Sequence, residues 1–343
     1  MSTLYLSDNV TNLTDLYYQD VNLVNIPSLK ANNVTECYRM FQGCTNIQSI
    51  GQIDFPNCNN FRAAFTTCSN LNTLPIQPKD FKNNIDYAFL YHECINLIFN
   101  LNDVDVSDCG LEGVFRSTNI RNINNCTFTN CNLNTTFRFT NMLYSMCNTN
   151  ITNCTMYQTF WYSVNANKGI FHSIDNCKFE NISAFQTFVQ CENLVEVNNT
   201  SINNTHYTQY MFANCYNLTY LNGFSINNVH LMSYMFDRCR ALIDIPILNL
   251  DNTTNMVCAF RYCNNLSANS YANIANSLPL ATNLTNQYLS NIGLDVSNFT
   301  SDQINILNNK GYIDAIPPIP PSPEKLTYYN IYYNTNDEVV DGG

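Results

Sequence analysis

The chain repeats one stretch of sequence, Met211-Phe212-Ala213-Asn214-Cys215-Tyr216-Asn217-Leu218-Thr219-Tyr220-Leu221, with small changes along most of its length. The centre of the pattern is Phe-x-x-Cys-x-Asn-Leu, where x is any residue. Copies that begin at Phe188, Phe212, Phe236 and Phe260 follow one another at intervals of 24 residues. A unit of this length is too small to bury its own apolar face, so successive units must stack. The sequence therefore predicts a solenoid.

Further copies extend the array toward the N-terminus, and the pattern weakens only from Phe115 to Phe160. They begin at Phe41, Phe65, Tyr91, Phe115, Phe137 and Phe160, with Tyr91 standing where other copies have Phe. We place the repeat array at 31–267, after an N-terminal cap at 1–30 and before a helical C-terminal cap at 268–313. In that cap, one helix is expected after Ser267 and another from Ser301, as its N-cap, to Gly311.

Two kinds of sequence alternate within a repeat. Leu231, Met232, Met235 and Phe236 are spaced like one face of a short helix. The following Asn-Leu-x-x-Leu segment favours a short strand, and an Asx residue then marks a turn, as in Ile226-Asn227-Asn228. These features predict an α/β repeat, a leucine-rich-repeat-like solenoid of short strands and short helical turns with about 24 residues per repeat.

The repeated pattern resembles the BspA-like leucine-rich-repeat proteins of bacterial surfaces and bacteriophages. The resemblance rests on the segments 40–47, 64–71, 187–194, 211–218 and 259–266, and on 235–242 except at Ala241. Residues 301–312 are similar to the segment that closes such arrays. The resemblance implies a leucine-rich-repeat fold and a role in recognition. Residues 109–187 depart from the pattern, because the Cys is missing from the core position there.

A Pro-rich segment and a tail follow the array. The segment 314–324 favours a stiff polyproline linker. The tail at 325–343 contains an aromatic-rich run that favours one strand and is a candidate for assembly; its residues are Tyr328, Tyr329, Ile331, Tyr332 and Tyr333. A lone strand is unstable, so this one would dock on the array, on another copy or on a partner. The alternative is a disordered tail.

Composition narrows the classes of partner. The chain has 343 residues, of which 12% are charged, and a formal net charge of −11. Without a cluster of Lys and Arg it does not favour nucleic acid or an anionic membrane surface, and no apolar run is long enough to span a bilayer. No signal peptide is visible at the N-terminus. We therefore expect a virion protein, or alternatively one at the cell surface or in the cytoplasm.

The 16 Cys residues do not indicate disulfides or metal sites. Seven lie at the repeat core and five at Asx turns, where equivalent residues of neighbouring coils stack about 4.8 Å apart. A disulfide prefers a Cβ separation of about 3.8 Å, so buried free thiols are predicted. His92 and His172 have nearby acidic residues only by chance. Without a nucleophile elbow or phosphate-binding loop, we expect a non-enzyme with no cofactor and no metal.

Surface tyrosines provide the candidate binding site. They fall between the core positions, where they would line an exposed face; the candidates are Tyr38, Tyr210, Tyr220, Tyr234 and Tyr262. Aromatic faces and amides suit recognition of protein or carbohydrate, although these rings would equally fill gaps between coils. The function expected is attachment, as a bacteriophage tail fibre, tip or decoration protein that binds a host surface glycan or protein. Alternatives are a structural spacer or adaptor, or a bacterial surface adhesin, and a homo-oligomer is compatible with each.

Overall fold

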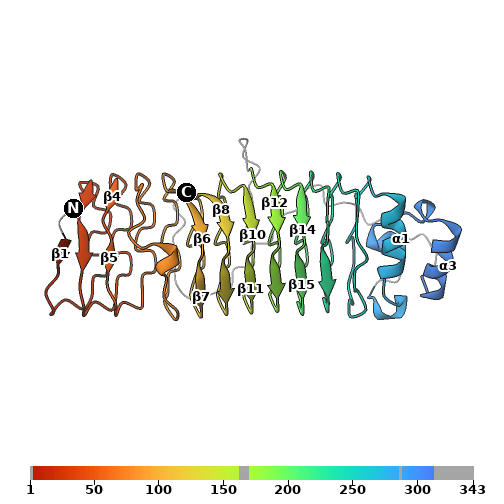
Figure 1. Ribbon diagram of the computed structural model, residues 1–343, viewed down its shortest axis with the longest axis horizontal. Helices are drawn as coiled ribbons and strands as arrows, with labels where there is room; N and C mark the ends of the chain where they lie inside the picture. Colours follow the sequence, from red (N-terminus) through yellow and green to blue (C-terminus); the bar gives the residue numbers. More distant parts are fainter. Residues whose placement is uncertain (1–2, 162–169, 286–287, 313–343) are drawn as a thin grey trace.

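The computed structural model describes residues 3–161, 170–285 and 288–312, and these form an elongated parallel β-solenoid (Figure 1). The chain winds in coils, and each coil hydrogen-bonds to the next through short parallel strands. The predicted repeat and the predicted solenoid are confirmed. Because every coil adds the same elements in the same order, side chains 24 residues apart lie on top of one another in the regular part of the array.

Two long sheets run along the central part of the solenoid. The first has the order β14-β12-β10-β8-β6 and contains β6 (Ile98–Asn102), β8 (Asn119–Asn124), β10 (Ser145–Cys147), β12 (Ser173–Asp175) and β14 (Glu196–Asn198). The second has the order β16-β15-β13-β11-β9-β7 and contains β7 (Asp105–Ser107), β9 (Thr127–Thr129), β11 (Asn150–Thr152), β13 (Lys178–Glu180), β15 (Ser201–Asn203) and β16 (Ser225–Asn227). In the second sheet Phe128, Ile151 and Phe179 stack in register and are buried.

Two smaller sheets lie at the N-terminal end. One contains β1 (Thr3–Tyr5), β3 (Ser28–Lys30) and β5 (Ile53–Asp54), and the other pairs β2 (Asn25–Ile26) with β4 (Ser49–Ile50). A third side of the solenoid is held by single parallel bridges that run from Asn12 to Asn255. The coil between Asn60 and Asp86 is longer than its neighbours and carries the short 3-10 helix η1 (Pro78–Asp80).

The segment before each Phe is a series of hydrogen-bonded turns, which corrects the expectation of short helices. Around Phe236, Tyr234 and Arg238 have left-handed backbone, with φ of 59° and 62°. The N–H groups of Tyr234, Phe236 and Arg238 donate to carbonyls of the next coil, whereas that of Asp237 donates three residues back. A helix would direct all of these groups along its own axis. The left-handed residues instead turn alternate N–H groups toward the next coil.

The ring residue of each repeat forms one continuous stack inside the solenoid. Phe188, Phe212, Phe236 and Phe260 are buried, and the ring centroids of neighbours lie 5.3, 5.6 and 5.9 Å apart with nearly parallel planes. The stack begins at Tyr17, whose ring lies 5.2 Å from that of Phe41. Rings at this separation gain contact energy in addition to their burial. This stack is the centre of the hydrophobic core.

All 16 Cys residues are free, and 15 of them are buried. The thiol of Cys215 donates a hydrogen bond to the carbonyl of Phe188 at 3.2 Å, and that of Cys239 donates to the carbonyl of Phe212 at the same distance. Burial raises the pKa of Cys191 and Cys239 well above the usual value of a thiol. These thiols are therefore small core side chains that satisfy a backbone oxygen of the preceding coil.

Helices close the C-terminal end (Figure 1). They are α1 (Ala268–Ser277), α2 (Leu289–Ile292) and α3 (Ser301–Asn309), with 3-10 helices η2 (Ala281–Asn283) and η3 (Val296–Asn298) between them. Ser267 is the N-cap of α1, as predicted. The N-cap of α3 is Thr300 rather than Ser301, because its side chain forms a capping box with Gln303. None of the described helices is long and apolar enough to cross a membrane.

The predicted polyproline linker at 314–324 and the candidate assembly strand, with Tyr328, Tyr329, Ile331, Tyr332 and Tyr333, lie outside the described residues.

Candidate binding face

The turns beside the buried ring stack carry their own outward side chains, which form one face of the solenoid. We call this the turn face and define it as the outward side chains within three residues of a stacked ring. Because the turns are stacked coil on coil, outward side chains of neighbouring coils contact one another. Contacts between Arg side chains and aromatic rings of neighbouring coils recur on this face.

The middle of the turn face contains two Arg residues and two aromatic rings. The guanidinium carbon of Arg138 lies 4.0 Å from the ring centroid of Trp161 and 4.6 Å from that of Phe139. Arg116 lies 5.7 Å from the same Phe139 ring. Burial lowers the pKa of Arg138 to about 10, and the charge of Arg116 contributes to this shift. Arg138 remains charged at neutral pH, so this part of the face presents positive charge between aromatic rings.

Amide side chains hold this part of the turn face in place. Arg138 donates to Oε1 of Gln158 at 3.2 Å, and Gln158 in turn donates to Oε1 of Gln186 at 2.8 Å. The indole N–H of Trp161 donates to Oε1 of Gln190 at 2.6 Å. These bonds link three successive coils. They fix the side chains before any partner binds, which lowers the entropic cost of association.

An outer row of rings continues the face toward the C-terminal end. Tyr157 stacks on Phe185 at 5.7 Å, Phe185 contacts Tyr210 edge to face at 5.7 Å, and Tyr210 stacks on Tyr234 at 4.6 Å with an angle of 3° between the ring planes. All four are half-buried. Burial raises the pKa of Tyr210 to about 12, so its hydroxyl remains a neutral donor and acceptor at physiological pH.

A buried ion pair anchors the C-terminal end of this row. Arg261 donates two hydrogen bonds of 2.9 Å to the carboxylate of Asp237, and both side chains are almost fully buried. The guanidinium carbon of Arg261 lies 5.2 Å from the Tyr234 ring and 5.3 Å from the Tyr262 ring. The side chain of Arg261 therefore orients both tyrosines, of which Tyr262 is 39% exposed.

The structure brings together three of the five tyrosines predicted from the sequence. Tyr210, Tyr234 and Tyr262 form the C-terminal part of the turn face. Tyr38 lies on the same face near the N-terminal end, where it contacts Arg39 at 4.7 Å. Tyr220 is 42% exposed but lies on a different side of the solenoid, where it forms bridges in line with β14.

The sequence analysis missed the Arg residues and Trp161 as parts of this face. Trp161 is half-buried and covers Arg138. A signal for this arrangement was present. Arg116, Arg138 and Arg261 each follow a repeat ring directly. Eight Arg residues in the whole chain are few, and their recurrence at one repeat position is informative.

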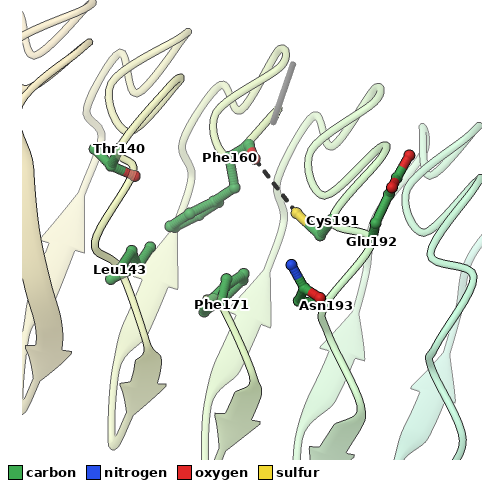
Figure 2. Close-up of a pocket in the computed structure, with 7 residues that line it drawn as sticks. All are labelled: Thr140, Leu143, Phe160, Phe171, Cys191, Glu192 and Asn193. Atoms are coloured by element: carbon green, nitrogen blue, oxygen red, sulfur yellow. Dashed lines mark hydrogen bonds between the residues drawn. The ribbon is translucent and has the colours of Figure 1, made fainter. Parts of the chain in front are cut away.

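Two pockets among the described residues are small. Figure 2 shows one of them, in which the rings of Phe160 and Phe171 lie side by side 5.8 Å apart and Cys191 donates to the carbonyl of Phe160. Its volume is about 10 Å³, which is room for a water molecule at most. A larger pocket of about 220 Å³ lies beside η1 and is lined in part by Asp54, Asp80 and Lys82. Ligand pockets usually exceed about 300 Å³.

The two His residues considered in the sequence have structural contacts. Burial lowers the pKa of His92 to about 4, although the carboxylate of Glu93 lies 3.5 Å from its Nε2 atom. His172 stacks on Tyr144 at 5.4 Å. In the part of the chain that the structure describes, no three His, Cys, Asp or Glu residues are grouped to hold a metal ion. The turn face is therefore the strongest candidate for a functional surface.

Comparison with known proteins identifies a family. The model of one family matches residues 11–128 and 154–274, which together are more than two thirds of the chain and nearly all of the solenoid. No curated protein and no solved structure shows a significant match to the chain. The chain belongs to the family described as "Mycoplasma protein of unknown function, DUF285".

Proposed function

We propose that this protein is a non-enzymatic recognition module that attaches to a macromolecule on a cell surface through its turn face. The observation that carries the proposal is two series of outward contacts on this face, one from Arg116 to Trp161 and one from Tyr157 to Tyr262. Arg, Tyr and Trp are the side chains most enriched at the energetic centres of protein interfaces. Here they recur on one side of a long rigid scaffold.

The geometry of this face favours tight recognition. Half-buried rings keep a large contact area but lose little side-chain entropy on binding, because neighbouring coils already hold them. The Arg138–Gln158–Gln186 chain does the same for the polar groups. The face extends along the solenoid axis, so it suits an extended partner such as a surface protein or a glycan chain.

The setting that we propose is attachment to a host receptor, either from a virion or as an adhesin of a cell surface. The resemblance of the repeats to BspA-like leucine-rich-repeat proteins supports a role in recognition. The competing function is that of a spacer, in which the solenoid only separates other parts of an assembly. A spacer requires the buried core but not the outward rings, and this difference provides the test.

The experiment compares two tyrosine variants of the full chain. In the first, Tyr210→Ser and Tyr234→Ser are combined, which removes the stacked pair from the turn face. In the second, Tyr220→Ser removes an exposed ring from another side. Fluorescently labelled proteins are applied to a printed glycan array and to intact cells of candidate hosts, and thermal unfolding is measured in parallel.

We expect the wild type to bind, the Tyr220→Ser control to bind equally, and the double variant to lose at least tenfold in apparent affinity with its fold retained. Equal binding by all three proteins would exclude the turn face as the binding surface. Absence of wild-type binding on every surface would favour the spacer.

A further inference from the structure

The two ends of the solenoid differ in how they are covered. At the C-terminal end, the N–H groups of Cys258 and Phe260 donate to the carbonyls of Asn291 and Ile292, so the segment around α2 takes the place of a further coil. The helices α1 and α3 pack against each other beyond this point. The core is therefore closed at this end, as terminal units of a solenoid must be.

At the N-terminal end, core positions are exposed. Leu4 of β1 is 49% exposed, whereas Leu29, its register partner in β3, is 5% exposed. Leu16 is 48% exposed, whereas Met40, which lies 24 residues later at the equivalent position, is 1% exposed. Other exposed apolar side chains of this first coil are Tyr5, Val21 and Val24. Together they form an apolar end surface of the kind that another coil covers everywhere else in the array.

On the turn side of this end, backbone carbonyl groups of the first coil also have no N–H donors from a preceding coil among the described residues. On the turn side, each coil accepts hydrogen bonds from the coil before it: the carbonyls of Tyr38 and Met40 accept from the N–H groups of Asp15 and Tyr17. The equivalent carbonyls of the first coil belong to Thr14 and Leu16. No described residue donates a backbone hydrogen bond to either of them. In addition, among the described residues β1 pairs only with β3, so no described strand lies along its other edge.

These features specify what could cover the end. The occupant must be an extended segment with apolar side chains that supplies backbone N–H groups to the carbonyl row and pairs with the edge of β1. A second copy approaching with its own first coil would place carbonyl opposite carbonyl on the turn side. Such an end-to-end dimer leaves the buried acceptors unsatisfied, which is costly.

The chain itself contains a segment of the required chemistry. Residues 326–333, Leu-Thr-Tyr-Tyr-Asn-Ile-Tyr-Tyr, are apolar, β-favouring and free of Pro. They are separated from Tyr312, which contacts Pro279 in the C-terminal cap, by the Pro-rich residues 313–325. At about 3.1 Å per residue these thirteen residues reach roughly 40 Å.

This reach is too short for the segment to cover the first coil of its own chain. Ten bridge intervals separate Asn12 from Asn255, at about 4.8 Å each. The bridged part of the array is therefore already roughly 48 Å long, and the cap extends farther. A second copy, however, can bring its first coil to the tail. We propose that residues 326–333 of one copy add as a strand to the open first coil of another copy and link the molecules head to tail.

The test uses two single variants of the full chain that block opposite partners of this contact. Leu16→Asp places a charge in the open end and leaves the tail intact, whereas Ile331→Asp places a charge in the tail strand and leaves the end intact. Tyr220→Asp is the control for an added charge at an exposed ring elsewhere. Molar mass is measured by light scattering after size-exclusion chromatography over a hundredfold range of protein concentration.

We expect the molar mass of the wild type and of Tyr220→Asp to rise with concentration beyond that of a dimer. Each of the other two variants alone should remain monomeric. Mixed together, they should form a dimer and nothing larger, because one intact tail meets one intact end. A variant that had simply unfolded would not be rescued by mixing.

A monomeric wild type at every concentration would overturn the proposal. So would association of Ile331→Asp alone, because the end would then be covered by something other than the tail. This experiment measures self-association and does not depend on binding to a cell surface. It can therefore fail while the proposed function holds, and the reverse is equally true.

Discussion

Phe212 and Phe236 stack inside the solenoid, whereas Tyr210 and Tyr234 stack outside it, only two residues away in the same turns. The inner rings lie 5.6 Å apart and the outer rings 4.6 Å apart, both with nearly parallel planes. The repeat imposes stacking on both pairs, since each coil places its residues above those of the coil before. Stacking alone therefore does not reveal a role. Burial separates the ring that holds the fold from the ring that is available to a partner.

The largest expected effect tests the inner ring. Phe212→Ala should lower the free energy of unfolding by about 3–5 kcal/mol, because it leaves a cavity in a continuous core stack. Tyr210→Ala should cost about 1 kcal/mol, because that ring is only partly buried. Urea unfolding followed by circular dichroism measures both. A loss below about 1 kcal/mol for Phe212→Ala would show that the inner stack is not the core.

The second prediction compares the buried Asp237–Arg261 ion pair with the partly exposed Asp15–Arg39 pair. Asp237→Ala removes the carboxylate of the buried Arg261 and should cost about 3 kcal/mol, because a buried charge is left without its partner. The matched change is Asp15→Ala, which breaks a pair with Arg39 of the same bidentate geometry in a partly exposed position. It should cost less than about 1 kcal/mol. Equal losses would mean that burial does not distinguish the two ends of the turn face.

The smallest expected effect concerns pH. His92 lies on the outward side of a turn but is mostly buried, and its pKa is lowered to about 4. The folded protein therefore keeps this ring neutral while the unfolded chain takes up a proton near pH 6.5. The contribution of His92 to stability is complete above pH 6.5 and is lost as the pH falls toward 4, by about 2–3 kcal/mol.

His92→Gln should remove this dependence. The difference in unfolding free energy between wild type and variant, measured at pH 7, 5.5 and 4, should shift against the wild type as the pH falls. A constant difference across this range would show that the ring is protonated equally in both states.

Much of the architecture was predictable, because in a solenoid residues at equivalent positions of successive repeats lie above one another. The interval between Phe188, Phe212 and Phe236 identified both the coil and its core ring. The free thiols followed from the same stacking. The candidate face was predicted only in part. Tyr210, Tyr234 and Tyr262 meet on it. Tyr220 instead bridges to Glu196 and Asp244 in line with β14, on another side of the solenoid, and its being a Tyr gave no sign of this.

The sequence by itself determined the period, the inward residues and the capping helices, because these depend on local pattern and on the burial of apolar side chains. The tertiary structure alone decided the conformation of the turns. Tyr234 and Arg238 are not residues that favour left-handed backbone, and they adopt it because their N–H groups then bond to the next coil. The same contacts between coils set Arg261 against Tyr234 and Tyr262, and so created a face that no single repeat contains.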